Sequence, residues 1–304
     1  MKLTPRVKKL LLVMAVLTVA ITLTGCSVPR NADGSIVLIK LDTTFQDIMS
    51  SENWFSAIFV WPLAEWINNM APTLGVGGSI AIVTIIVNGL LALATLKSTI
   101  GMQQMQLIQP ELEKLKMKYE GRNDDTSKMR QASEMQALYK KYDINPGSAL
   151  LVTFLQFPII MAMYMAVQRS YAVATGSFMG MDLQATPLAG MKTILNGEAM
   201  GWAYVALFVF MGLCQFFSMM TPIFIQKKKS EEEAEKHHTK PVKPSTQNKI
   251  MQYYMMGMIM IFGLMWPAAM SLYWAINSIV NVVKTLLVQK YIDNHNAKRE
   301  GARK

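Results

Sequence analysis

Amide and hydroxyl side chains recur inside the longest apolar stretches of this 304-residue chain. An amide in hydrocarbon without a hydrogen-bond partner costs several kcal/mol, so these groups must face one another or water. Bonding only to one another would hold helices together, at about 0.6 kcal/mol per contact. Because several stretches each contribute one or two such groups near mid-depth, we favour a shared hydrated cavity. The residues are Thr84, Asn88, Thr153, Gln156, Gln215, Ser218, Ser271, Tyr273, Trp274, Asn277, Ser278 and Asn281.

Patterns for bond-making chemistry are absent. The sequence has no HExxH, CxxC, GxSxG or Walker motif. No Asp, Glu or His lies inside an apolar stretch, which argues against a membrane protease, a proton pump and an ion-coupled transporter. The adjacent His237 and His238 fit a solvated pair better than a metal site. We therefore expect no enzyme activity, no cofactor and no metal.

The composition is typical of a membrane protein. Hydrophobic residues make up 52% of the chain and charged residues only 16%, against about 25% charged in soluble domains. The formal net charge is +10, but no base-reading motif accompanies it, so we expect no DNA partner. Contact of the basic C-terminal tail with ribosomal RNA stays open.

The N-terminus has the form of a secretory signal. Four basic residues precede the apolar run Leu10–Leu23, which is too short to span a bilayer comfortably. The following Gly25-Cys26 completes a sequence that resembles a bacterial lipobox. We expect cleavage after residue 25 and a diacylglyceryl anchor, with palmitate-type chains, on Cys26; the alternative is an ordinary signal with an incidental Cys. The second cysteine, Cys214, is expected to be an inert buried thiol.

Five later stretches are long enough, or nearly so, to cross a hydrocarbon core of about 30 Å. Pro267 separates the last two, which predicts a tight hairpin between them. The predicted spans are Val76–Leu96, Ser148–Val167, Trp202–Ile225, Ile250–Trp266 and Ala268–Val288.

Basic residues alternate between the segments that flank these spans. Cytoplasmic loops carry the excess of Lys and Arg, so the pattern places the mature N-terminus outside and the C-terminus in the cytoplasm. A lipobox independently requires an outside N-terminus. The counts are two in 26–75, nine in 97–147, two in 168–201, seven in 226–249 and five in 289–304.

Two regions between the spans are expected to be helical and one disordered. Residues 53–69 are rich in Trp and Phe and predict an amphipathic helix at the outer interface, with Pro62 as a potential kink; a partly buried turn is the alternative. The segment 97–147 predicts a mobile cytoplasmic helical hairpin that turns at 121–125, with Asp125, Thr126 or Ser127 as the second helix's cap. The charged loop 226–249 predicts disorder.

Short motifs in order along the chain resemble the YidC/Oxa/Alb family of membrane protein insertases, in the lipoprotein form of Gram-positive bacteria. Each motif alone is weak, but together they cover nearly all of 53–290 in the expected order. They are Phe59-Val60-Trp61-Pro62-Leu63, Gln109-Pro110-Glu111-Leu112, Lys118-Tyr119, Ala137-Leu138-Tyr139-Lys140, Asn145-Pro146-Gly147, Gln156-Phe157-Pro158-Ile159 and Leu272-Tyr273-Trp274-Ala275-Ile276-Asn277-Ser278.

The resemblance implies an all-α membrane protein with five transmembrane helices, a cytoplasmic helical hairpin and an outer interfacial amphipathic helix. It implies a hydrophilic groove open to cytoplasm and lipid, through which nascent membrane proteins enter the bilayer, with the ribosome and the Sec translocon as further possible partners. By resemblance the groove is lined or flanked by Thr84, Asn88, Gln156, Gln215, Tyr273, Trp274 and Asn277.

The chain departs from this family at Asn88, which stands where an Arg is expected in the first span. A neutral side chain there should weaken any attraction of the groove for acidic substrate tails, although Lys97 lies about 13.5 Å closer to the cytoplasm. Two other classes stay open on the sequence: a small-solute transporter or channel, and a lipid-anchored assembly scaffold.

Overall fold

The computed structural model describes residues 28–122, 124–142, 144, 147–236, 238 and 246–301. Within these ranges all regular secondary structure is helical, which confirms the predicted all-α class. The chain divides into two compact units, which are described separately. The first comprises residues up to Val83 together with Leu155–Gln184, and the second comprises Thr84–Phe154 and the residues from Ala185 onward.

The first unit contains short helices around the ends of two long ones. Its N-terminal segment is ordered: α2 begins after Thr44, whose hydroxyl accepts from the backbone N–H of Asp47 while the Asp47 carboxylate accepts from the Thr44 N–H. This reciprocal capping box fixes the start of a seven-residue helix that the sequence analysis did not predict. The elements are α2 (Phe45–Ser51), the π-helix η1 (Ser56–Val60), the first part of α3 (Trp61–Ala94), the last part of α7 (Gly147–Arg169) and α8 (Tyr171–Thr175).

The helix expected at the outer interface runs directly into the first predicted span. η1 continues into α3, and the change of direction lies at Gly75, with φ 71° and ψ 165°. Glycine adopts such a positive φ without steric penalty. Pro62 lies two residues after the π-helix η1, and a kink there stays a prediction.

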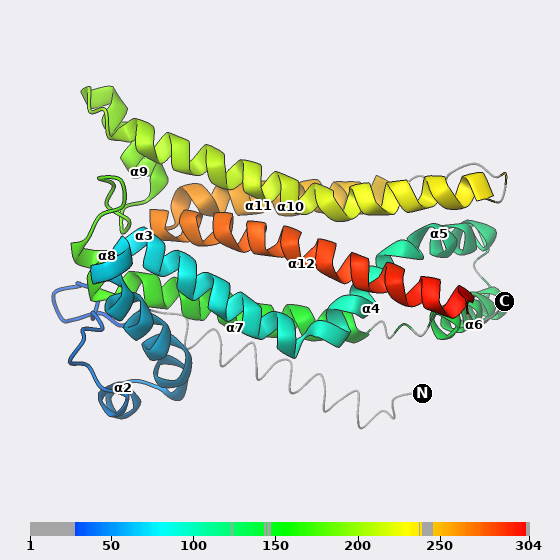
Figure 1. Ribbon diagram of the computed structural model, residues 1–304, viewed down its shortest axis with the longest axis horizontal. Coiled ribbons are helices and arrows are strands. Elements are labelled where there is room, and N and C mark those ends of the chain that lie inside the picture. Colours follow the sequence, from blue (N-terminus) through cyan, green and yellow to red (C-terminus); the bar gives the residue numbers. More distant parts are fainter. Residues whose placement is uncertain are drawn as a thin grey trace. The chain divides into compact units, whose positions relative to one another are not determined.

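The second unit is built around α10 and α12, which pack against each other along their lengths (Figure 1). Buried apolar residues of both helices form this interface, and Gly263 of α11 lies where an added Cβ would meet the Met211 side chain of α10 at 2.6 Å. The elements are the rest of α3, α4 (Leu96–Leu107), α5 (Gln109–Lys118), α6 (Asp125–Lys141), the first part of α7, α9 (Pro187–Lys192), η2 (Thr193–Asn196), α10 (Gly201–Lys236), α11 (Thr246–Met265) and α12 (Ala268–Gly301).

Three helices among the described residues are long and apolar enough to cross a membrane. They cover Ser56–Ala94, Gly201–Glu232 and Ala268–Asn294, and a shorter apolar helix covers Gln252–Met265. The predicted spans also lie almost entirely within helices, including α7 and α11. The count of five spans nevertheless stays a prediction.

Charged segments are more helical than the sequence suggested. α10 continues to Lys236, so the first part of the loop expected to be disordered is helical; the rest lies largely outside the described residues. Two ion pairs at helical spacing support this extension, Lys227–Glu231 and Lys228–Glu232. The segment after the first span also contains α4, a helix that was not predicted.

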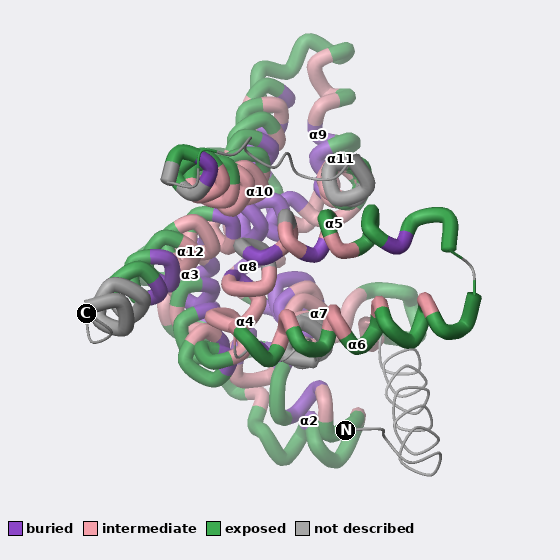
Figure 2. The backbone as a smooth tube through the Cα atoms, turned by 90° about the vertical axis from the view of Figure 1, so that its right-hand side faces the viewer, coloured by how far each residue is buried: buried purple, intermediate pink, exposed green. Residues whose placement is uncertain are grey.

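The helices α5 and α6 pack together through a small apolar cluster. The buried residues of this cluster are Ile108, Leu112 and Ile144. Leu138 of α6 and Tyr142, the residue that follows α6, pack against them. The cap of α6 is Asp124, whose carboxylate accepts from the Ser127 N–H at 2.8 Å, and not one of the three residues expected. No described residue of α6 is buried, as the green and pink tube in Figure 2 shows.

Candidate functional site

Three of the predicted site residues lie on consecutive turns of α12. Tyr273 is fully buried, Trp274 is buried and Asn277 is half-buried. The Tyr273 hydroxyl and the Asn277 amide oxygen are buried atoms for which the described residues provide no hydrogen-bond partner. A buried polar group left unpaired costs about 1–3 kcal/mol, so both atoms require water or a bound polar group. They lie one turn apart on the same face of the helix.

Gln215 of α10 makes a different kind of contact. Its side-chain oxygen accepts from the Ser278 hydroxyl of α12 at 2.7 Å. This bond joins the two helices, so at this position the alternative reading of the polar residues, as interhelical hydrogen bonding, has direct support.

Aromatic rings stack against this region of α12 through Trp274. The Trp274 ring stacks on Trp266 with centroids 5.4 Å apart, and Trp266 stacks in turn on Phe262 at 5.2 Å. These rings fix the Trp274 side chain in a rigid apolar wall next to the Tyr273 and Asn277 positions.

Thr84 and Asn88 lie one turn apart in α3, and both side chains are buried. The Asn88 side-chain nitrogen donates to the Thr84 backbone carbonyl at 2.9 Å, a bond within the same helix. Gln156 is half-buried in α7 and belongs to the first unit. The gathering of all seven predicted residues around one groove stays a prediction.

Lys284 is a charged residue of α12 that the sequence analysis overlooked. It lies inside the candidate span Ala268–Asn294 and is half-buried. The signal was available in the sequence, because an ionisable residue within an apolar run is by itself an indication of function. A criterion limited to Asp, Glu and His inside the spans does not include a lysine.

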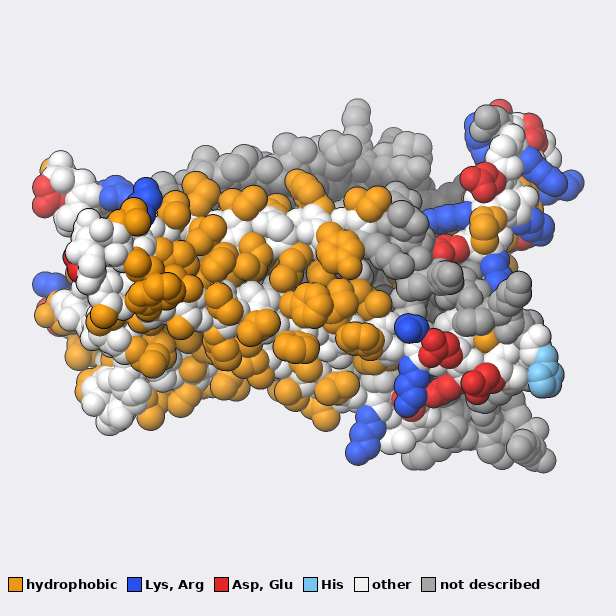
Figure 3. All heavy atoms as spheres, turned by 90° about the horizontal axis from the view of Figure 1, so that it is seen from above, with side chains coloured by type: hydrophobic (Ala, Val, Ile, Leu, Met, Phe, Trp, Pro, Cys, Tyr) orange, Lys and Arg blue, Asp and Glu red, His pale blue; other side chains and the backbone are white. Residues whose placement is uncertain are grey.

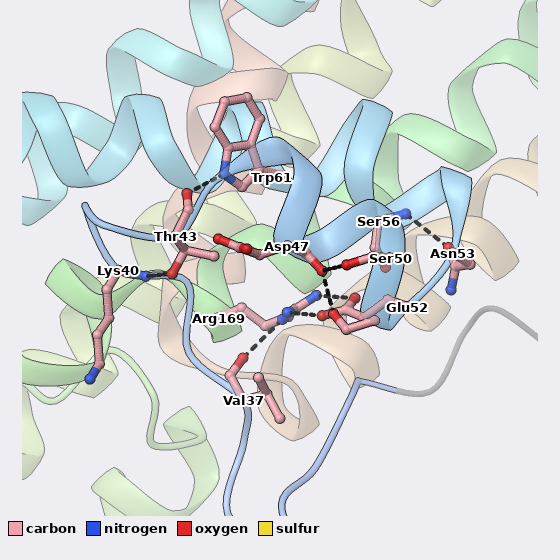
Figure 4. Close-up of polar contacts among 11 residues, drawn as sticks. Val37, Lys40, Thr43, Asp47, Ser50, Glu52, Asn53, Ser56, Trp61 and Arg169 are labelled. Carbon is pink, nitrogen blue, oxygen red and sulfur yellow. Dashed lines mark hydrogen bonds and ion pairs between the residues drawn. The ribbon is translucent and has the colours of Figure 1, made fainter.

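A second overlooked group is a buried ion pair in the first unit. The Arg169 side chain is 0% exposed and pairs with Glu52, which is 9% exposed. Arg169 Nη1 donates to Glu52 Oε2 at 2.8 Å and Arg169 Nε donates to the Val37 carbonyl at 2.9 Å (Figure 4). The end of α7 is thereby tied both to α2 and to the N-terminal segment.

Asn68 of α3 bonds both to the N-terminal segment and to the residues that follow α7. Its side-chain nitrogen donates to the Ile39 carbonyl at 2.7 Å, and its oxygen accepts from the Ser170 hydroxyl at 2.7 Å and the Ala172 N–H at 3.0 Å. Ile39 is fully buried and also bonds through its backbone to Arg169 and Tyr171. Only the folded backbone reveals this hub, since an isolated Asn in a helix has no sequence signature.

Polar contacts also join α4, α10 and α12 near the end of the apolar part of α12. Gln103 donates to the Thr285 carbonyl at 3.1 Å and to the Gln289 side chain at 3.0 Å. Gln289 donates to Asp293 at 2.8 Å, and Asp293 pairs with Lys229. These bonds fix α4 to α12, and α12 to α10, within the second unit.

The contact between α5 and α6 is electrostatic as well as apolar. Lys118 Nζ lies 2.8 Å from Glu134 Oε2, and the Tyr119 hydroxyl donates to the same carboxylate. Hydrogen bonding to Lys118 and then to Tyr119 holds the pKa of Glu134 below its ordinary value of 4.5, and the bond to Glu134 raises the pKa of Lys118 above 10.5. Both charges are exposed, so the pair orients the helices more than it stabilises them.

The described side chains of α10 present an apolar surface. Figure 3 looks from the side where α10 lies in Figure 1 and shows hydrophobic side chains over it, with charged ones at the ends. Among the described residues no three His, Cys, Asp or Glu side chains gather as metal ligands would. The exposed large side chains of α10 are Trp202, Val209, Phe210, Leu213, Phe216, Phe217 and Phe224.

The structure describes one of the two cysteines. Cys26 lies outside the described residues. Cys214 is half-buried in α10 with a free thiol, and is thus less buried than expected.

Comparison with known proteins gives a consistent result. Residues 66–296 match the family model described as 60Kd inner membrane protein. The chain is 30% identical to the membrane protein insertase YidC of Oceanobacillus iheyensis, over 79% of this chain and 86% of that protein. It is 27% identical to the insertase MisCA of Bacillus subtilis, over 79% and 80%, and 27% identical to the YidC of Alkalihalophilus pseudofirmus, over 91% and 93%.

Proposed function

Since the chain belongs to the 60Kd inner membrane protein family, whose bacterial members include the YidC insertases, we infer that it is a membrane protein insertase of the bacterial cell membrane. Its substrates are membrane proteins that are being inserted into the bilayer. The ribosome and the Sec translocon are further partners that the sequence resemblance suggests.

The observation that carries a mechanism is the pair of buried, unpaired polar atoms on α12. The Tyr273 hydroxyl and the Asn277 oxygen lie inside a helix of membrane-spanning length. Water in a groove beside them satisfies both atoms. The same water shortens the distance over which a substrate must carry polar backbone and charge through hydrocarbon, and this lowers the insertion barrier without any bond chemistry.

The groove so proposed is lined or flanked by residues of the second unit, Thr84, Asn88, Gln215, Tyr273, Trp274 and Asn277. The same role for Gln156, in the first unit, stays an expectation from the resemblance. Asn88, a neutral amide, stands where the resemblance leads one to expect Arg, and its side-chain nitrogen donates to the Thr84 carbonyl. Replacing it by Arg should be tolerated if water reaches the site, whereas Asn88→Leu should impair insertion more than stability. Failure of Asn88→Arg to fold, with full activity of Asn88→Leu, would place Asn88 in dry protein or lipid.

The proposed topology has Cys26 lipidated outside, α5 and α6 in the cytoplasm, and the C-terminus in the cytoplasm. Mass spectrometry of the mature N-terminus should find a diacylglyceryl-modified Cys26. A thiol introduced at Asn123, between α5 and α6, should react with an impermeant reagent only from the cytoplasmic side. An unmodified Cys26 would remove the lipid anchor from the proposal, and labelling of residue 123 from outside would reverse the topology.

The function is tested by complementation of an insertase-depleted strain with the full chain, followed by insertion assays in vesicles. The chain should restore growth and insert single-span substrates with short outer tails. A transporter or channel would instead move solute or ions without inserting protein, and an assembly scaffold would restore one complex without inserting isolated substrates.

A further inference from the structure

The short helix α2 has an apolar face that packs only in part against the protein. Ile48 is buried, whereas Phe45 is 43% exposed and Met49 is 48% exposed. At about 100° per residue, these three side chains point within a sector of about 100°. The protein covers the Ile48 edge of this sector, and Phe45 and Met49 form its open edge.

The open edge of α2 is held in a fixed orientation. The helix begins at a reciprocal capping box, and Glu52, directly after its last residue, pairs with the buried Arg169 (Figure 4). The Trp61 indole nitrogen donates to the Thr43 carbonyl at 2.8 Å, and the Phe45 ring packs edge-on against the Trp61 ring with centroids 5.9 Å apart. Because the helix is tied at both ends, the exposure of its open edge is a property of the folded chain.

The helix α2 adjoins a second apolar surface, which leads into the membrane. It packs against η1, and η1 continues into α3 as part of the candidate span Ser56–Ala94. Trp54, Ile58 and Phe59 are 49%, 50% and 38% exposed, and the Trp54 and Phe59 rings meet edge-on with centroids 6.3 Å apart. Tryptophan is enriched where a membrane meets water, so this surface marks the level of the membrane boundary.

Lipid is the occupant that fits the open edge best. Asp47 points about 180° from the middle of the Phe45–Met49 pair, so a helix parallel to the membrane surface buries one side in lipid and keeps this carboxylate in water. A protein partner needs more area. The large apolar side chains of α2 and η1, each about half exposed, present on the order of 500 Å², against roughly 800 Å² per partner in a stable interface. Lipid requires no minimum area, and it surrounds the span into which η1 continues.

We propose that α2 lies in the outer membrane–water interface and inserts Phe45 and Met49 among the lipid chains of the outer leaflet. The N-terminal segment thereby has a membrane contact of its own, separate from the helix expected at 53–69 and from the lipid proposed on Cys26. Through the pair of Glu52 with Arg169, the same contact positions the end of α7 at the membrane surface. The inference uses the proposed topology, in which this segment lies outside, and is independent of insertase activity.

The test places an environment-sensitive dye, nitrobenzoxadiazole, on α2 of the full chain in phosphatidylcholine vesicles. Met49→Cys and Ser50→Cys are labelled in a Cys214→Ala background, since Cys214 has a free thiol. The dye at residue 49 should be quenched by lipid with a nitroxide on its chain, and several-fold less by aqueous iodide than the dye at residue 50. Ser50 is the matched control, because it is exposed and points about 120° from the middle of the open edge. Cys214→Ala alone, treated with the same dye, supplies the background from any unmodified Cys26.

Two results would overturn the inference. Equal quenching by iodide at residues 49 and 50 would show that both sides of α2 face water. Shielding of residue 49 from iodide without quenching by the nitroxide lipid would assign the open edge to protein, and to a second copy if the shielding disappears when each vesicle holds one chain. If Met49→Cys lowers the unfolding temperature, Phe45→Cys provides the same measurement at the other residue of the open edge. Failure of the chain to insert substrates would refute the proposed function and leave these quenching results unchanged.

Discussion

The Arg169 and Asn68 side chains of the first unit and the Tyr273 and Asn277 side chains of α12 are used in opposite ways. In the first unit, Arg169 and Asn68 each make several bonds that tie the N-terminal segment to α3 and α7. On α12, Tyr273 and Asn277 keep buried atoms without partners. Buried polarity stabilises a fold only when it is satisfied internally. Buried side-chain atoms of Ser56, Glu65 and Gln168 in the first unit also lack a partner among the described residues. What distinguishes α12 is that two such atoms lie one turn apart on one face of a helix of membrane-spanning length.

The largest effect should come from breaking the buried ion pair. Arg169→Met leaves the Glu52 carboxylate nearly buried without its partner, and should lower the free energy of unfolding by about 3–5 kcal/mol. Thermal unfolding in detergent measures the loss. Arg30→Met, at an exposed arginine of the same N-terminal segment, is the control and should change little. A loss below about 1 kcal/mol for Arg169→Met would mean that the pair is not structural.

Asn68→Ala should have the next largest effect. It removes the acceptor of the Ser170 hydroxyl and the Ala172 N–H and one of the two donors to the Ile39 carbonyl, and should cost about 1–3 kcal/mol of stability. Its neighbour Asn69 is exposed and bonds only within its own helix, to Glu65, so Asn69→Ala serves as the matched control. If the two variants unfold at the same temperature, the hub at Asn68 contributes nothing.

Tyr273→Phe should barely change stability, although Tyr273 is fully buried. The hydroxyl it removes has no partner among the described residues, so the free energy of unfolding should stay within about 0.5 kcal/mol of the parent value. A loss as large as that of Asn68→Ala would show that the hydroxyl is a structural donor, and the contrast between the two regions would disappear.

The smallest effect concerns the α5–α6 pair and depends on pH. Because the pKa of Glu134 is lowered on folding, the stability it contributes is present above about pH 4.5 and is lost as the pH falls through its folded pKa. The raised pKa of Lys118 predicts loss on the alkaline side, above about pH 10.5. Hydrogen exchange of α5 and α6 measures both. Glu134→Gln should abolish the loss of protection of α5 and α6 at acid pH. Glu120→Gln, at an exposed glutamate between the two helices, should leave that loss unchanged.

Sequence reasoning predicted the helices better than it predicted their ends and contacts. Apolar runs predicted the positions of α3, α7, α10, α11 and α12, because helices that bury apolar side chains in lipid or protein must be rich in apolar residues. The position of the α3 bend at Gly75, the Asp124 cap and the extension of α10 to Lys236 depend on local geometry and ion pairing that several neighbouring residues could equally provide.

The candidate site was predictable in part for the same reason. Tyr273, Asn277 and Gln215 stand out as polar residues in apolar runs, and Lys284 could have been found by the same criterion. Arg169 and Asn68 could not, because their partners lie on segments more than 25 residues away in sequence, Ile39 and Glu52 among them. Which polar groups are satisfied and which are not becomes visible only in the folded chain.

The most direct test of the central claim compares Asn277→Leu with the parent chain in one preparation. Both are reconstituted into vesicles, and insertion of a single-span, neutral-tail substrate is measured beside the unfolding temperature. Our account predicts an unchanged unfolding temperature and insertion slowed by about an order of magnitude, as for a loss of about 1.4 kcal/mol of barrier lowering. Insertion at the parent rate by a folded Asn277→Leu protein would contradict the account. The polar face of α12 that carries Tyr273 and Asn277 would then have no part in moving the substrate.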